Sequence, residues 1–291
     1  RIPDYTVERN YKTISTTAGY LAKNFGDKAR LEPTGALAAL YCNQQPSACP
    51  DQPALTWKGD SRPTILQFDP FLFDPGSEDV ALPKDLISRS FETLMDDRGD
   101  LAIQYSGGQG DLKLRDQVRE LMALEGIKSS VEDIVMTTGS QHGLDLISGL
   151  FLDKGDVVLA EGPSYVGAIG IFRHYEAHIE HVETDHDGIQ PEALKETIAR
   201  LKTQGRKIKF LYLVPNFANP SGVTLADKRR AKIVEICRRN KILILEDNPY
   251  GLLYFDKKVP DALRSIDDNV IYLGSFSKIL DPGFRVGYVL A

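Results

Sequence analysis

The sequence predicts an α/β fold with a mainly parallel sheet of seven strands flanked by helices. From Ile134 onward, short runs rich in β-branched residues alternate with stretches of helical periodicity, which is typical of repeated strand and helix units. Polar residues follow most of these runs, and such sheets bind ligands at the carboxyl ends of their strands. A chain of 291 residues, 42% of them apolar, is long enough to bury a full core.

Seven short apolar runs are predicted as strands because turn residues bound each of them. They are residues 134–138, 157–160, 178–182, 208–214, 242–246, 270–274 and 285–290. Helices are predicted in most of the intervals between them. One helical face of residues 140–151 holds Leu144, Ile147, Leu150 and Phe151, and one face of residues 227–239 holds Ile233, Val234 and Cys237.

The first 80 residues have a different pattern, with scattered Pro and Gly and only short helical segments. We predict that residues 1–80 form an N-terminal arm and part of a smaller domain, and that residues 81–291 form the large domain. Residues 284–291 are an apolar, strand-like run with no closing polar segment. We therefore expect most of the smaller domain to lie in a C-terminal part outside this sequence.

Composition narrows the class of protein. A formal net charge of -6 argues against a nucleic-acid partner, which normally requires a basic face. The three cysteines, Cys42, Cys49 and Cys237, have no metal-binding spacing, and their odd number suits a reducing compartment. There is no signal-like N-terminus and no apolar run long enough to span a membrane. These features predict a cytoplasmic protein with small-molecule partners, no bound metal and no membrane association.

The first candidate binding segment is Gly139-Ser140-Gln141-His142-Gly143, which follows a predicted strand and opens a helix. Small residues allow close approach of a ligand, and the free N–H groups of a helix start favour an anion such as phosphate. Taken alone, the segment is better explained as an ordinary helix start with Ser140 as its N-cap.

Two further segments follow predicted strands. Asn219-Pro220-Ser221-Gly222 fits a simple turn, although an Asn held by the next Pro can donate a hydrogen bond to a ligand oxygen. Asp247 and Tyr250 belong to the run Glu-Asp-Asn-Pro-Tyr, where a carboxylate among apolar residues needs a cationic or hydrogen-bonding partner. For a single Asp, a turn residue or a helix N-cap is the commoner explanation.

The most specific segment is Ser275-Phe276-Ser277-Lys278, with Arg285 just beyond. We expect a Lys at the end of a buried strand to be poorly solvated, which makes its amine nucleophilic toward a carbonyl. Hydroxyl groups and Arg285 can hold a phosphate. An isolated match of this kind is more often a surface Lys after a Ser-rich turn.

In combination, these segments resemble the class I/II aminotransferases of pyridoxal phosphate (PLP) fold type I. The resemblance is closest to the subgroup of 2-aminoadipate and kynurenine aminotransferases and the effector domains of MocR-type regulators. It spans Tyr105 to Tyr288, in an ordered series of motifs. They are Tyr-Ser-Gly-Gly-Gln-Gly at 105–110, Glu-Gly-Pro-Ser-Tyr at 161–165, Val-Pro-Asn-Phe-Ala-Asn-Pro-Ser-Gly at 214–222, Glu-Asp-Asn-Pro-Tyr at 246–250 and Gly-Ser-Phe-Ser-Lys at 274–278.

The resemblance implies that residues 81–291 bind PLP and that Lys278 carries it as a Schiff base and moves the proton at the substrate Cα. Asp247 would pair with the pyridinium nitrogen, and Tyr165 would stack on the ring. Asn219 and Tyr250 would bond the phenolic oxygen. The implied phosphate ligands are Ser140, Gln141, Ser275, Ser277, Arg285 and, from a neighbouring subunit, Tyr105. A site shared in this way implies a homodimer.

Two positions depart from the subgroup, which usually has a second Asp where this chain has Asn248 and a small or apolar residue where it has Asp281. The Arg that grips the substrate carboxylate in the family belongs to the C-terminal part, so no residue here is given that role.

The predicted activity is amino transfer between an amino acid (2-aminoadipate, aromatic or similar) and a 2-oxo acid. A PLP-dependent lyase or decarboxylase is the first alternative, since the fold does not fix which bond breaks. A MocR-type sensor is the second, disfavoured because residues 1–80 lack a basic helix-turn-helix pattern.

Overall fold

The computed structural model describes residues 30–31, 57–58, 84–105, 107–254 and 257–291. The chain divides into two units, Arg1–Ala81 and Leu82–Ala291. In the first unit, strands β1 (Arg30–Leu31) and β2 (Trp57–Lys58) pair antiparallel. The predicted N-terminal arm, with Cys42 and Cys49, otherwise lies outside the described residues, so the proposed domain division stays a prediction.

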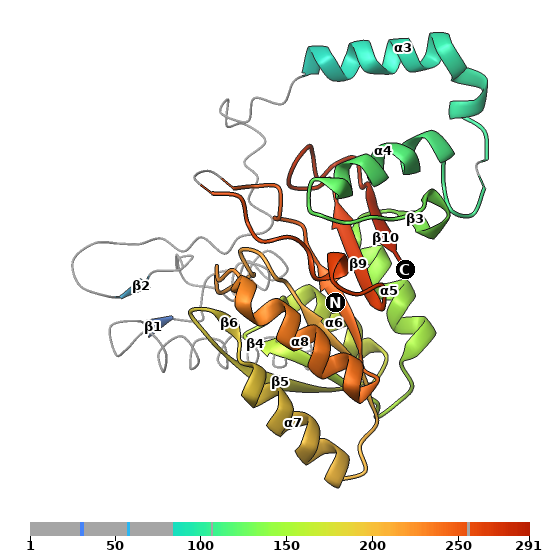
Figure 1. Cartoon of the computed structure of the whole chain (residues 1–291). Coiled ribbons are helices and arrows are strands. Elements are labelled where there is room, and N and C mark those ends of the chain that lie inside the picture. Colours follow the sequence, from blue (N-terminus) through green and yellow to red (C-terminus); the bar gives the residue numbers. More distant parts are fainter. Residues whose placement is uncertain (1–29, 32–56, 59–83, 106, 255–256) are drawn as a thin grey trace, which may run out of the picture. The chain divides into compact units, whose positions relative to one another are not determined.

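The second unit contains one sheet of eight strands in the order β3-β10-β9-β8-β7-β4-β5-β6 (Figure 1). The strands are β3 (Ile134–Thr137), β4 (Val157–Gly162), β5 (His178–Asp185), β6 (Gly188–Ile189), β7 (Ile208–Leu213), β8 (Leu243–Asp247), β9 (Val270–Ser275) and β10 (Gly287–Leu290). The neighbouring pairs among β5, β4, β7, β8 and β9 are parallel, whereas β10 runs antiparallel to both β3 and β9. The α/β fold and all seven predicted strands are confirmed.

The eighth strand, β6, was not predicted. It has two residues and pairs antiparallel with the end of β5. Gly188, which begins it, has φ 90°, a conformation that favours glycine. A strand of this length has no periodicity that a sequence pattern can reveal.

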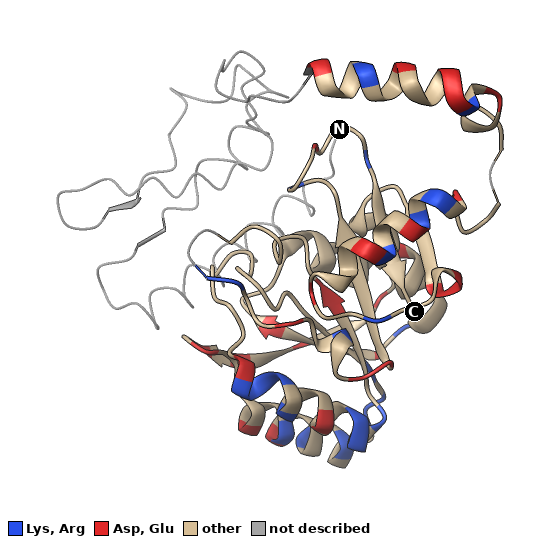
Figure 2. Cartoon of the chain, turned by 45° about the horizontal axis from the view of Figure 1, so that its top comes forward, with Lys and Arg blue, Asp and Glu red and all other residues tan. Residues whose placement is uncertain are grey.

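Helices fill the intervals as expected. They are α3 (Lys84–Ala102), α4 (Leu112–Ala123), α5 (Ser140–Phe151), α6 (Val166–His174), α7 (Pro191–Thr203) and α8 (Asp227–Asn240), with short 3-10 helices η2 (Val131–Asp133) and η3 (Leu263–Ser265). No described helix is long and apolar enough to cross a membrane. On α7 and α8, acidic and basic side chains are interspersed (Figure 2).

The central strands are buried on both faces because helices cover each side (Figure 1). Alternate residues of a strand point to opposite faces. One set, including Leu159, Leu211 and Ile244, packs with α7 and α8. The other, including Phe210 and Leu245, packs with α5 and α6. The sheet is therefore the middle layer of three.

Two details of the predicted helix faces can be compared with the structure. Leu144 and Ile147 of α5 are buried, but Leu150, predicted on the same face, is 80% exposed and so is wrongly placed. The buried face of α8 includes Ile233 and Cys237, as predicted. Cys237 is a free thiol, and burial raises its pKa to about 12.

Candidate active site

The predicted site residues inside the sheet domain gather at one edge of the sheet, where β3, β4, β7, β8 and β9 end and β10 begins (Figure 1). Parallel strands bring their carboxyl ends together, so loops far apart in the sequence meet there. The residues are Ser140 and Gln141 at the start of α5, Tyr165 before α6, Asn219 after β7, Asp247 and Tyr250 at the end of β8, Ser275, Ser277 and Lys278 at the end of β9, and Arg285 before β10.

The start of α5 is open to a ligand. Gly139 precedes the helix with φ 88°, and no side chain caps the helix start. A Cβ placed on Gly287 of β10 would come within 2.5 Å of the Gly139 carbonyl carbon, so only glycine lets these two backbones pass so closely. The positive end of the helix dipole is therefore presented at the edge of the sheet.

Arg285 adds a positive charge at the same place. Its Nη2 donates to the Thr138 carbonyl at 3.2 Å, and a Cβ on Gly139 would lie 2.7 Å from that nitrogen. Arg285 has φ 54°, a left-handed conformation that is uncommon for a residue other than glycine. A guanidinium beside the positive end of a helix forms a site suited to an anion such as phosphate.

Hydroxyl groups from the end of β9 lie in the adjoining loop. Ser275 Oγ accepts from the Ser277 backbone N–H at 3.1 Å and donates to Ser277 Oγ at 3.0 Å. Lys278 follows them and is exposed. The expectation that Lys278 is poorly solvated is therefore wrong for this chain, because the buried strand ends at Ser275 and the lysine lies three residues beyond it.

Asp247, the one acidic residue among the predicted site residues, is buried, at 3% exposed. Asp247 is two residues beyond Leu245 on β8, so both side chains point to the same face of the sheet. This is the face that α5 and α6 cover. Its Oδ2 accepts from the Tyr212 hydroxyl at 2.8 Å, whereas its Oδ1 is buried with no hydrogen-bond partner among the described residues. Burial raises the pKa of Asp247 to about 6.

Tyr165 lies within electrostatic range of Asp247. Burial, followed by the charge of Asp247, raises the pKa of Tyr165. Its hydroxyl donates to Gln141 Oε1 at 3.2 Å, and Gln141 Nε2 donates in turn to the Gly167 carbonyl at 3.2 Å. The half-buried Tyr165 ring is thus attached to the start of α5.

Asn219 and Tyr250 meet across the ends of β7 and β8. Their side chains share a hydrogen bond, and burial followed by the charge of Asp247 raises the pKa of Tyr250. Behind them, buried Asn216 Nδ2 donates to Asn248 Oδ1 at 3.0 Å. Two loops that sequence analysis treated separately are therefore fastened together.

Tyr105 is the predicted residue that the structure does not bring to this cluster. Its side chain is fully exposed, and its backbone N–H donates to Gln104 Oε1. No hydrogen bond among the described residues joins its hydroxyl to the other predicted site residues. Its predicted action in a partner subunit stays untested.

Sequence analysis missed two buried polar residues of the site. Tyr212 is the next-to-last residue of β7, and its place near the end of an apolar run was the available signal. Glu161 is the next-to-last residue of β4 and was quoted only as part of a motif, yet its Oε2 accepts from the Val214 N–H at 2.9 Å. Burial raises the pKa of Glu161 to about 7. This contact fixes the start of the loop that carries Asn219.

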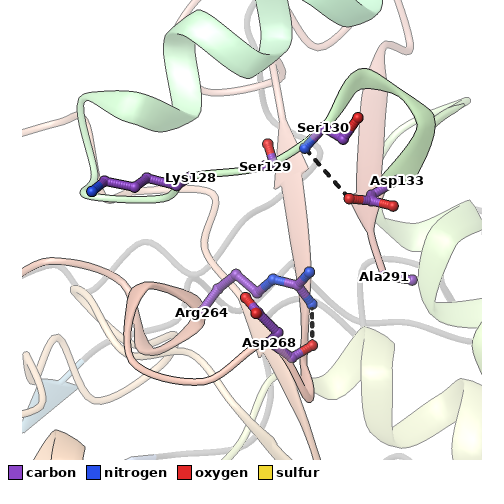
Figure 3. Close-up of a pocket in the computed structure, with 7 residues that line it drawn as sticks. All are labelled: Lys128, Ser129, Ser130, Asp133, Arg264, Asp268 and Ala291. Carbon is purple, nitrogen blue, oxygen red and sulfur yellow. Dashed lines mark hydrogen bonds between the residues drawn. The ribbon is translucent and has the colours of Figure 1, made fainter.

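A pocket elsewhere on the sheet domain contains none of the predicted site residues (Figure 3). It is lined by Lys128, Ser129, Ser130, Asp133, Arg264, Asp268 and Ala291. Arg264 Nη1 donates there to the Asp268 carbonyl at 2.6 Å. The anion-binding features and Asp247 are therefore found outside this pocket.

Comparison with known proteins gives a consistent result. The family model for aminotransferase class I and II matches residues 82–291. Aromatic-amino-acid aminotransferase 1 of Thermococcus litoralis is 36% identical over 212 residues, which are 72% of this chain and 51% of that protein. The 2-aminoadipate transaminase of Thermus thermophilus is 35% identical, over 79% of this chain and 56% of that protein. The chain spans about half the length of these relatives.

The chain is also similar to solved aminotransferase structures and to transcriptional regulators. The crystal structure of Pyrococcus horikoshii kynurenine aminotransferase in complex with PMP has a TM-score of 0.68 and 38% identity, covering 72% of this chain and 52% of that one. An uncharacterised HTH-type transcriptional regulator of Bacillus subtilis is 31% identical, over 72% of this chain and 42% of the regulator. Both branches of the subgroup that the motifs indicated are represented.

Proposed function

Because the chain belongs to the class I and II aminotransferase family, we propose that it is the cofactor-binding part of a PLP-dependent transaminase. The enzyme moves an amino group between an amino acid and a 2-oxo acid. The amino donor is 2-aminoadipate, an aromatic amino acid or a similar compound, which are the substrates named for its relatives.

The observation that carries the proposal is the unpaired Oδ1 of Asp247. A buried carboxylate oxygen without a donor costs about 1–3 kcal/mol, so the position calls for a ligand that donates a hydrogen bond. The protonated ring nitrogen of PLP is such a donor. The helix start of α5 and Arg285 fit the other end of the cofactor, which carries a phosphate.

When bound, PLP supplies an electron-poor ring that accepts the electrons of a bond broken at the substrate Cα. Asp247 holds the ring nitrogen in its protonated state, because a nearby negative charge favours the charged pyridinium. Tyr165 would lie against one face of the ring, and Asn219 and Tyr250 would bond its phenolic oxygen.

The phosphate is held by residues from three segments. They are Ser140 and Gln141 at the start of α5, Ser275 and Ser277 at the end of β9, and Arg285. Hydroxyl and backbone N–H groups orient the phosphate, while the guanidinium and the helix dipole balance its charge.

Lys278 performs the covalent and proton-transfer work. Its amine would hold the cofactor covalently through the cofactor aldehyde. When a substrate amine has displaced it, the free amine of Lys278 would carry the proton between the substrate Cα and the C4′ carbon of the cofactor.

We further propose a homodimer in which Tyr105 of each subunit bonds the phosphate of the other. The full exposure of the Tyr105 ring in the single chain supports this assignment, because an aromatic residue of this size is usually at least partly covered. The enzyme is expected in the cytoplasm, with no nucleic-acid or membrane partner.

The competing functions are a PLP-dependent lyase or decarboxylase and, supported by the similar regulator, a ligand-sensing domain. The decisive experiment incubates the purified full-length protein with a panel of amino acids and 2-oxoglutarate, and measures the oxo-acid product and glutamate. Amino transfer predicts equimolar products, and Asp247→Asn should retain cofactor but lose most of the rate. Release of ammonia or CO₂ without glutamate would establish a lyase or decarboxylase, and no turnover with tight ligand binding would establish a sensor.

A further inference from the structure

The two oxygens of Asp247 have different surroundings. Oδ2 accepts a 2.8 Å hydrogen bond from the Tyr212 hydroxyl, and Oδ1 is buried without a partner among the described residues. A carboxylate normally accepts several hydrogen bonds through either oxygen. Here one oxygen is occupied by the protein, so the other is the acceptor left for a ligand.

Tyr212 is held so that its hydroxyl can hardly turn away. It is fully buried in β7, the strand next to β8, and lies on the same face of the sheet as Asp247. Its ring packs edge-on against Phe172, with centroids 5.3 Å apart and an interplanar angle of 70°. Phe172 in turn packs edge-on against Phe210 at 5.4 Å. The aromatic contacts fix the phenol while its oxygen reaches the carboxylate.

The phenol also remains a donor over the working pH range. Burial, followed by the charge of Asp247, raises the pKa of Tyr212 well above its ordinary value. The hydroxyl therefore keeps its proton and can donate it in the hydrogen bond to the Asp247 carboxylate. A buried tyrosine hydroxyl that has one acceptor specifies the orientation of that acceptor.

We propose that Tyr212 is a positioning residue for the cofactor ring: by occupying Oδ2 of Asp247, it directs Oδ1 at the ring nitrogen. The inference rests on the proposed function, because it requires PLP to bind beside Asp247. Tyr212 itself touches neither cofactor nor substrate in this arrangement. Tyr212 influences the cofactor ring only by orienting the Asp247 carboxylate.

The test compares two ligands in the full-length protein and in its Tyr212→Phe variant. One ligand is PLP, and the other is its analogue with a C–H group in place of the ring nitrogen. Phe keeps the aromatic packing and removes the hydroxyl. We expect Tyr212→Phe to weaken PLP binding about tenfold, and to change binding of the analogue by less than about twofold. The dissociation constants are measured by absorbance titration and need no turnover.

Tyr272→Phe is a matched control. Tyr272 is also fully buried, in β9, and its hydroxyl also donates to a buried carboxylate, that of Glu125. No hydrogen bond among the described residues joins it to Asp247, so its substitution should not change the ratio of the two dissociation constants. In an Asp247→Asn background, Tyr212→Phe should likewise leave PLP affinity unchanged within about twofold.

The possible outcomes distinguish failure of the Tyr212 inference from failure of the proposed function. Equal weakening of both ligands by Tyr212→Phe means that Tyr212 only supports the fold, and it overturns the inference. Equal binding of both ligands by the unchanged protein means that Asp247 does not meet the ring nitrogen; the inference then fails while PLP binding stands. Failure of the unchanged protein to bind either ligand refutes the proposed function, and the inference with it.

Discussion

Asn248 Nδ2 donates a 2.6 Å hydrogen bond to Oε1 of Glu125, although the two residues are 123 positions apart. Both side chains are buried, and Asn248 directly follows Asp247. The same carboxylate accepts from the Tyr272 hydroxyl. Burial raises the pKa of Glu125, and both hydrogen bonds oppose that rise. The amide at position 248, where the subgroup usually has Asp, is therefore matched to a glutamate that needs a donor.

The first prediction follows from this match. Asn248→Asp would replace the donor with a second carboxylate oxygen beside Glu125, and one of the two would have to bind a proton. We expect a loss of about 2–4 kcal/mol in the free energy of unfolding at pH 8, measured with urea. The loss should be smaller at pH 5, where the shared proton is more easily supplied.

Glu125→Gln provides the reciprocal variant. In the double variant, the Gln amide can donate to the new Asp while its oxygen still accepts from Tyr272. The double variant should be more stable than Asn248→Asp alone, with a favourable coupling of at least about 1 kcal/mol. Additive effects of the two substitutions would show that the Asn248 to Glu125 contact does not determine which residue is tolerated.

A second prediction concerns Lys278. The full-length protein should be isolated yellow, and borohydride should fix the cofactor to the chain irreversibly, because reduction converts the imine to a stable amine. Mass spectrometry of the digested protein should place the adduct on Lys278. A Lys278→Ala variant that still gave a reducible adduct would remove Lys278 from its proposed role.

The third prediction uses the pKa of Asp247, which burial raises to about 6 from an ordinary value near 3.8. Because the folded state holds the proton more tightly than the unfolded state, the stabilising effect is complete below pH 3.8 and is lost as pH rises through about 6. The loss for the cofactor-free protein is on the order of 3 kcal/mol.

Asp247→Asn removes this titration and keeps the side-chain shape. The cofactor-free Asn variant should therefore gain stability relative to the unchanged protein as pH rises from 4.5 to 8, in urea unfolding experiments. Added PLP should reduce the difference, since its ring nitrogen supplies the missing partner. A difference that stays constant with pH would mean that Asp247 does not titrate in this range.

Much of the fold follows from sequence periodicity. Apolar runs bounded by turn residues identified the seven long strands, because burial on both faces leaves a continuous apolar signal. In the folded sheet, Asp247 and Tyr212 lie on one face, because Tyr212 pairs with Leu245, the residue two positions before Asp247. What periodicity does not supply is the register between strands. Tyr212 pairs across from Leu245 only in the folded sheet, so its contact with Asp247 was not predicted.

Other parts of the site lie beyond sequence reasoning for physical reasons. The contact between Glu125 and Asn248 joins distant segments and leaves no local pattern. Lys278 was expected to be poorly solvated from its place after a buried strand, but it is exposed, three residues beyond the end of β9. The arrangement of a loop depends on its tertiary contacts, whereas a buried strand can be predicted from its own apolar residues.

The last prediction is that Tyr105 acts in the partner subunit of a homodimer. It precedes the loop of residues 107–110, and its exposed ring needs a covering surface. If the hydroxyl bonds the partner's cofactor phosphate, Tyr105→Phe should weaken PLP binding by one charge-assisted hydrogen bond, on the order of 1.5–3 kcal/mol. If the ring only packs in the interface, the same change should leave PLP affinity intact.

Mixing subunits tests whether the hydroxyl acts across the interface. In a heterodimer of Tyr105→Phe and Lys278→Ala subunits, one site combines the intact lysine of the first with the intact tyrosine of the second. That site should bind PLP with normal affinity and transaminate, and the other site should do neither. Each heterodimer is therefore expected to have about half the activity of the unchanged dimer. By itself, the Lys278→Ala variant is inactive and the Tyr105→Phe variant binds PLP weakly. If Tyr105 acted within its own subunit, the heterodimer site with an intact lysine would lack the hydroxyl, and PLP affinity would not recover.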